Sequence, residues 1–129
     1  MKQQGFLEFI NNGKVTLTGG DISIDETWQE HQKFKGVYLK HLIKGTYTDG
    51  ILSSHMVRIE PHAVLEEHVH DAQWELHEVI EGEGVFLLDN SERPYYPGRM
   101  AVIPKGVKHR VTAGSRGLVM LAKFFPALL

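Results

Sequence analysis

Short runs of branched and aromatic residues alternate with turn-forming residues along most of the chain. Runs of this length, bounded by Gly, Pro, Asn and Asp, are typical of β-strands. Helical periodicity does not persist beyond about two turns, and its best window is 25–34. We predict strands at ten ranges: 6–10, 14–18, 36–43, 52–60, 64–70, 75–81, 84–89, 100–103, 109–112 and 118–124. Turn signals at intervals of about 8–12 residues predict an all-β sandwich or barrel.

One predicted strand is apolar on both faces. Residues 85–88 read Val-Phe-Leu-Leu, whereas a half-exposed antiparallel strand alternates apolar with polar residues. Another surface must therefore cover the outer face: the N-terminal segment, a second subunit, or both. We favour a homodimer, because symmetric dimers are the commonest assembly.

The first 35 residues are more polar than the rest of the chain. We expect residues 1–35 to form a strand extension that packs on the barrel or on a partner subunit, and residues 36–129 to form the main domain. With 129 residues, the chain has the length of one ordinary domain.

Composition excludes several classes of function. The chain has no cysteine, which excludes disulfides and thiolate chemistry. Its net charge of -2 comes without charge blocks, so we expect neither nucleic acid nor a membrane surface as a partner. The N-terminus lacks the apolar core of a signal peptide, and we expect a soluble cytoplasmic protein. Eight histidines, four of them between His62 and His77, favour a nitrogen and oxygen metal site.

The candidate metal ligands begin with His68 and His70. On a strand, residues i and i+2 point to the same face about 7 Å apart, so two imidazoles can bind one ion at about 2 Å. Glu75 opens the next predicted strand, and an antiparallel neighbour can return its carboxylate beside the histidines. A buried carboxylate without a partner is expensive, and coordination would remove that cost. His109 begins a distant strand and indicates nothing by itself.

Two sequence strings frame these residues. From His68 the chain reads H-x-H-x4-E-x6-G, and from Gly98 it reads G-x5-P-x-G-x2-H, which ends at His109. The strings resemble the paired signature motifs of the cupin superfamily, and the resemblance covers residues 61–109. The 15 residues between the strings are similar to the short spacing of small microbial cupins.

Two positions depart from the cupin pattern. His62 stands where the first motif usually opens with Gly, and Ala113 stands where the second usually closes with Asn. Both lie outside the expected metal ligands, so they put in doubt the closeness to a characterised subfamily and leave the site intact.

The resemblance implies a cupin jelly-roll β-barrel of two antiparallel sheets, with His68, His70, Glu75 and His109 facing its interior. Such a ligand set suits one divalent transition metal ion, Fe, Mn, Ni, Cu, Co or Zn, and argues against Mg or Ca. Four protein ligands leave one or two positions open on a five- or six-coordinate ion, and an open position permits catalysis.

Other residues have alternative interpretations. His77 shares the strand face of Glu75, so it is our candidate catalytic residue, as a partner of Glu75, a substrate donor or a general base; the alternative is an inert histidine that fills the barrel. His55 either faces the barrel or lies in a core or interface. An inward Arg58 would indicate a carboxylate substrate, but we expect it outside. We expect His31 and His41 in loops or at the surface.

The resemblance implies an enzyme that acts on a small organic molecule, and we favour a dioxygenase. Decarboxylases, lyases and isomerases are alternatives within the same metal chemistry. A non-catalytic module that binds or senses a small molecule is an alternative of another class, because a fold does not fix a function. A closed structural metal site would require a fifth ligand such as His77.

Overall fold

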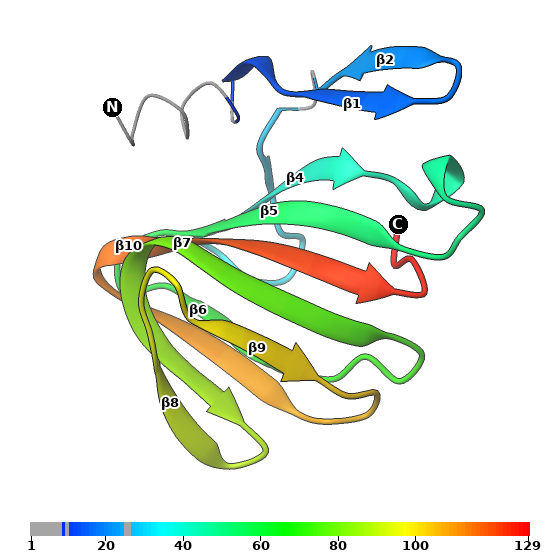
Figure 1. Ribbon diagram of the computed structural model, residues 1–129. Coiled ribbons are helices and arrows are strands. Elements are labelled where there is room, and N and C mark those ends of the chain that lie inside the picture. The colour runs from blue at the N-terminus through cyan, green and yellow to red at the C-terminus, as the bar shows by residue number, and fades with distance from the viewer. Residues whose placement is uncertain (1–8, 10, 25–26) are drawn as a thin grey trace.

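The computed structural model describes residues 9, 11–24 and 27–129 of the chain. Within them the fold is built of β-strands, with helical residues at Phe9, Asn11 and Asn12 and one short 3-10 helix, η1 (Gly45–Tyr47), as Figure 1 shows. The strands are β1 (Lys14–Leu17), β2 (Gly20–Ser23), β3 (Gln29–Glu30), β4 (Val37–Ile43), β5 (Ser53–Ile59), β6 (Val64–His68), β7 (Trp74–Leu88), β8 (Ser91–Tyr95), β9 (Met100–Ile103) and β10 (His109–Phe125).

Two long antiparallel strands, β7 and β10, organise the barrel. The C-terminal part of β10 pairs with β5 and with the N-terminal part of β7, while β3, β4 and β9 extend this first layer. The other ends of the two strands pair with β6 and β8 to form the second layer. This arrangement confirms the expected all-β jelly-roll barrel of antiparallel sheets, and β1 and β2 form the additional N-terminal sheet.

The two layers join where β7 and β10 change register, between Ala113 and Leu118. Gly82 lies at this corner with a φ of +86°, and a Cβ there would collide with the carbonyl oxygen of Gly117. A residue with a side chain would therefore strain the backbone and separate the two strands. This glycine lets both strands pass from one layer to the other without interruption.

The structure corrects several element boundaries. The strands predicted at 75–81 and 84–89 are one strand, β7, and those at 109–112 and 118–124 are one strand, β10. The helical window at 25–34 is wrong where the structure describes it, because Gln29–Glu30 forms β3 against Leu39 and Tyr38. Strands β2 and β8 were not predicted. The strand predicted at 6–10 lies outside the described residues except for Phe9, which is helical and not in a strand.

A second apolar cluster lies outside the barrel. Ile24 from the N-terminal segment packs with Leu42 and Met56, and Val15 and Trp28 pack against them. In Figure 1 the β1–β2 sheet accordingly lies over β4 and β5. The N-terminal segment therefore covers part of the outer face at β4 and β5, whereas Val85, on the strand for which the sequence required a covering, is 41% exposed.

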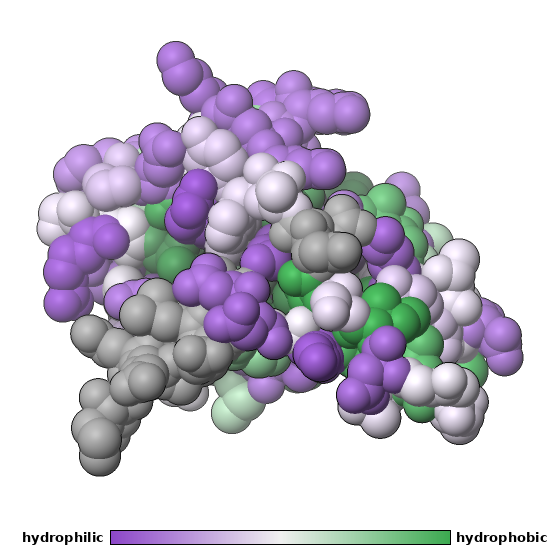
Figure 2. Space-filling view, turned by 90° about the horizontal axis from the view of Figure 1, so that it is seen from above, coloured by the Kyte–Doolittle hydropathy of each residue, from purple (hydrophilic) through white to green (hydrophobic). Residues whose placement is uncertain are grey.

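Another part of the outer face stays open in the single chain. Met100 and Val102 on β9 are 67% and 60% exposed. From the side of the N-terminal sheet, the surface is largely polar with some exposed hydrophobic residues (Figure 2). The homodimer stays a prediction, and a mass measurement in dilute solution that found only monomer would contradict it.

No helix among the described residues is long and apolar enough to cross a membrane.

Candidate metal centre

The four residues predicted as metal ligands converge on one point. His68 ends β6 and pairs with His109 at the start of β10, His70 follows in the next loop, and Glu75 lies near the start of β7. One ligand atom from each lies within 4.8 Å of the others. Bonds of about 2.1 Å separate two ligand atoms by at most about 4.2 Å, so a small inward movement would fit an ion.

Backbone contacts turn two of these imidazoles toward that point. Nδ1 of His68 lies 2.7 Å from the carbonyl oxygen of Glu66, and Nδ1 of His109 lies 3.1 Å from that of Val107. Because a carbonyl oxygen only accepts, each Nδ1 carries the hydrogen and each Nε2 keeps a free lone pair. Hydrogen bonds from the ring nitrogen that does not face the metal orient metal-binding histidines in this way.

The loop before His109 is tied to the other ligands. The amide of Gly106 donates to the carbonyl oxygen of His70 at 3.0 Å, and Gly106 has a φ of +73°. The turn that the motif predicts therefore brings the second motif against the first.

Glu75 has the environment of a metal-binding carboxylate. Its side chain is buried, and Oε1 lies 3.0 Å from Nε2 of His109 and 3.6 Å from Nε2 of His70. Neither Oε1 of Glu75 nor Nε2 of His109 has a hydrogen-bond partner of adequate geometry. Buried polar atoms without partners are rare and costly. A divalent cation between them would satisfy both, so these residues fit a metal.

Charge in the site favours the metal-binding protonation states. Burial alone raises the pKa of Glu75, but the contact with His77 at Oε2 outweighs it and holds the pKa below its usual range. Burial, with a contribution from His109, lowers the pKa of His68 to about 4. A carboxylate and an unprotonated imidazole are the forms that bind metals, so binding at neutral pH displaces no proton from either.

His77 contacts Glu75 on the other carboxylate oxygen. Its Nε2 lies 2.8 Å from Oε2 of Glu75, and its Nδ1 lies 2.8 Å from the hydroxyl of Tyr95. Its side chain is fully buried, and it is not part of the four-residue ligand group. Of the roles open from the sequence, this geometry suits a residue that positions Glu75.

A cavity of about 90 Å³ adjoins the ligands and reaches His68, His70 and Glu75. Two further histidines, His31 and His55, and eight apolar side chains complete its walls. The sequence placed His31 in a loop or at the surface; it lies in the loop that follows β3, and it also lines the cavity. Its Nδ1 accepts from the amides of residues 33 and 34.

The C-terminal tail forms a wall that sequence patterns did not reveal. Leu128 and Leu129 line the cavity, and the Ser53 hydroxyl accepts from the Leu128 amide at 2.9 Å. The carbonyl oxygen of Leu129 accepts from the Gly45 amide at 2.5 Å. No local signal encodes these contacts, because they join residues more than 70 positions apart.

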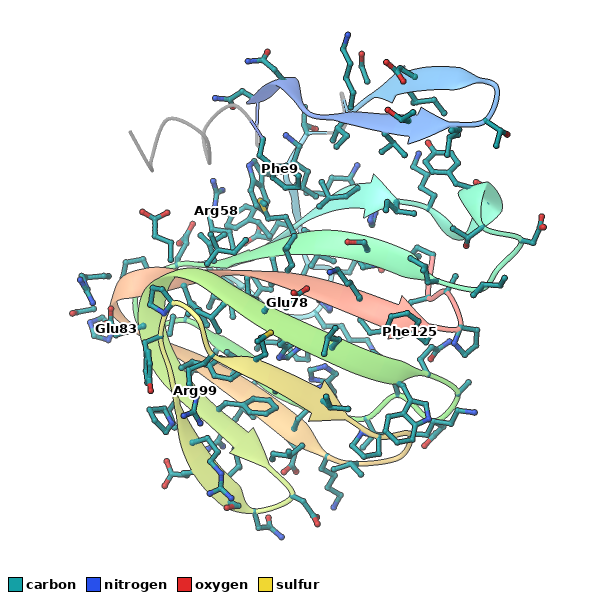
Figure 3. All side chains as sticks on the ribbon, viewed as in Figure 1. Phe9, Arg58, Glu78, Glu83, Arg99 and Phe125 are labelled. Atoms are coloured by element: carbon teal, nitrogen blue, oxygen red, sulfur yellow. The ribbon has the colours of Figure 1, made fainter. Side chains whose placement is uncertain are left out.

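His55 faces the cavity, which settles the alternatives left by the sequence. It is buried, and its Nδ1 lies 2.8 Å from Nδ1 of His41. Arg58 lies outside the barrel, as expected, with its guanidinium 4.8 Å from the Trp28 ring and 4.7 Å from the Tyr38 ring. Figure 3 shows Arg58 on the side of β5 that faces the N-terminal sheet.

Comparison with known families agrees with this geometry. A profile described as Cupin domain matches residues 55–122, a little more than half of the chain. The chain belongs to the cupin family. The matched part of this cupin contains all four candidate ligands and His77. A search of curated protein sequences finds no match.

Solved structures share the cupin fold. KdgF from Halomonas sp. is 22% identical, with a TM-score of 0.70 over 79% of this chain and 87% of that one. A predicted oxalate decarboxylase from Thermotoga maritima is 20% identical, with a TM-score of 0.73 over 79% and 94%. Ectoine synthase from P. lautus is 22% identical, with a TM-score of 0.65 over 72% and 66%. At these identities the likeness shows the fold alone.

Proposed function

We propose that this cupin binds one divalent transition metal ion through His68, His70, Glu75 and His109 and is an enzyme acting on a small organic molecule. The observation that supports it is the pair of buried, unpartnered atoms, Oε1 of Glu75 and Nε2 of His109, beside a cavity. Such atoms pointing into a ligand-sized space are typical of an open metal site.

The bound ion would supply Lewis acidity or a site for dioxygen. The residues of this chain would do the rest: the three imidazoles and Glu75 hold the ion, His77 orients the carboxylate, and the apolar walls exclude water. We favour a dioxygenase, because imidazole-rich sites with open positions suit iron chemistry. The names of two similar structures, a predicted oxalate decarboxylase and ectoine synthase, support non-oxidative reactions as the alternative.

The first experiment is elemental analysis of the purified protein beside His109→Ala. We expect about one transition metal ion per chain in the wild type and a loss of most of it in the variant. His62→Asn is the matched control, because His62 is exposed and its φ of +63° is one that asparagine tolerates. Full metal content in His109→Ala would contradict the proposed ligands.

The second experiment separates an enzyme from a binding module. Oxygen consumption by the iron-loaded protein is measured with small diketones, catechols and keto acids, with His109→Ala as the inactive control. Turnover with oxygen uptake supports the dioxygenase. Turnover without uptake supports a decarboxylase, lyase or isomerase, and saturable binding without turnover supports the non-catalytic alternative.

A further inference from the structure

The charge of the cavity walls limits what the cavity can hold. Glu75 is the only acidic residue that lines it, and neither lysine nor arginine lines it within the described part of the chain. Arg58 is the basic residue that the sequence analysis considered as facing the barrel interior, and it lies outside the barrel, in contact with two aromatic rings. A ligand in this cavity therefore meets no fixed cationic side chain.

The two histidines that are not ligands add no positive charge at neutral pH. Burial, with a contribution from His41, lowers the pKa of His55 to about 4. Burial also lowers the pKa of His31. With a divalent ion bound, the lining side chains thus leave a ligand the charge of that ion less that of one carboxylate, which is one positive charge.

One negative charge on the ligand balances this remainder. A second negative charge would lie among apolar side chains such as Val57, Leu65 and Phe124 without a partner, and an unpaired charge in an apolar environment is strongly disfavoured. Polyhydroxylated molecules are also disfavoured, because the walls offer few groups for hydrogen bonds beyond His31 and His55.

The volume sets a size. An apolar protein cavity of about 150 Å³ holds benzene, so the cavity of about 90 Å³ encloses a smaller group. By the same proportion, the part of a ligand inside it has about four non-hydrogen atoms.

We infer that the metal site takes a small ligand that binds the ion as a monoanion and carries a compact apolar remainder, and that it rejects dicarboxylates. This inference rests on the proposed function, because it requires the metal. It separates this chain from the oxalate chemistry named for one similar structure, although the fold is shared.

The experiment compares two small chelators on the zinc-loaded protein by calorimetry. Acetohydroxamate binds metals as a monoanion with a methyl group, and oxalate binds as a dianion of similar size through the same five-membered chelate ring. Each affinity is divided by that of the same chelator for free Zn²⁺. We expect this ratio to be at least tenfold higher for acetohydroxamate. An equal or higher ratio for oxalate, or no binding of either chelator, would overturn the inference.

Two charge-adding variants test the cause. Leu39→Lys places an amine in the cavity wall, and we expect it to raise the oxalate ratio at least tenfold relative to that of acetohydroxamate. Val85→Lys adds the same charge at an exposed position of β7 outside the wall, and should change neither ratio. A Leu39→Lys protein that folds, binds zinc and keeps the wild-type preference would contradict the charge argument.

Failure of the inference and failure of the proposed function are distinguishable. Zinc binding to the wild type and to Leu39→Lys is measured first, before any chelator is added. A protein that binds no zinc overturns the proposed function and this inference with it. A protein that binds zinc and prefers oxalate overturns only the inference.

Discussion

Nε2 of His77 lies 2.8 Å from Oε2 of Glu75, which leaves Oε1 to face His109. Because the carboxylate only accepts, Nε2 of His77 carries the hydrogen, and Nδ1 accepts from the Tyr95 hydroxyl. The same network fixes the tautomer of His77 and the rotamer of Glu75. Tyr95 suits this role, since burial and the charge of Glu75 raise its pKa and keep its hydroxyl protonated.

Replacing His77 should weaken metal binding without removing a ligand. We expect His77→Phe to lower the affinity by about 10–100-fold, the usual effect of losing a partner that orients a ligand. Competition with a chromophoric chelator measures the metal affinity. Tyr95→Phe should have a smaller effect, and His55→Phe, which removes a cavity histidine that makes no hydrogen bond to Glu75, serves as the control. Unchanged affinity in His77→Phe would contradict the positioning role.

His55 should make the metal-free protein sensitive to acid. The pKa of His55 in the folded protein, about 4, is lower than the ordinary histidine pKa of 6.5, so the unfolded chain binds the proton more tightly. The contribution of His55 to the free energy of unfolding is absent above pH 6.5, and it destabilises the fold increasingly as the pH falls toward 4. At pH 5 it amounts to about 2 kcal/mol.

Urea unfolding of metal-free wild type and His55→Phe at pH 7 and pH 5 measures this effect. The stability difference between the two pH values should be smaller in the variant by about 2 kcal/mol. His68 also has a lowered pKa, so a residual pH dependence is expected in both proteins. Parallel pH profiles for the two proteins would rule out the contribution of His55.

Gly82 should tolerate no side chain at the barrel corner. Gly82→Ala combines a positive φ with a collision against the Gly117 backbone, and we expect a loss of more than about 2 kcal/mol of unfolding free energy. Gly98→Ala is the matched control, because Gly98 has a φ of +95° and open space around its Cα. Gly98→Ala should lose only about 1 kcal/mol of unfolding free energy. Equal losses in urea unfolding would show that the close approach is unimportant.

Ser53 should hold the C-terminal tail over the cavity. Its hydroxyl accepts from the Leu128 amide at 2.9 Å and the Leu129 amide at 3.5 Å. In Ser53→Ala we expect faster hydrogen exchange at these two amides, about tenfold or more for the loss of a buried hydrogen bond. Ser54→Ala, a neighbouring buried serine, should leave exchange unchanged. Identical exchange in the two variants would show that other contacts fix the tail.

The candidate metal ligands could be predicted because they stand at the positions of the cupin motifs. His68 ends β6, but His70 lies in the following loop and not on the strand face that the i+2 spacing predicted; the turn at Gly106 has the positive φ that glycine permits. The apolar strands were recognisable because burial on one face leaves a period of two. Features that depend on one or two neighbouring elements are visible in a sequence.

Strand β8 shows where this reasoning ends. It reads Ser-Glu-Arg-Pro-Tyr and pairs only with β7 among the described strands. At an edge, proline and charged side chains are tolerated, so the segment resembles a loop. Partnering with β7 makes it a strand, and its last residue, Tyr95, then reaches His77. His31 is similar, because β3 brings it to the cavity only by pairing with β4.

The residues that shape the far side of the cavity, His31, Leu39, Leu128 and Leu129, all lie outside residues 55–122. The segment that the cupin profile matches thus carries the four candidate metal ligands and part of the cavity wall, and residues on both sides of it complete the wall. Substitutions in these outer residues would change the cavity without replacing a candidate ligand. A different ligand preference could therefore arise, or be engineered, outside the residues of the cupin profile.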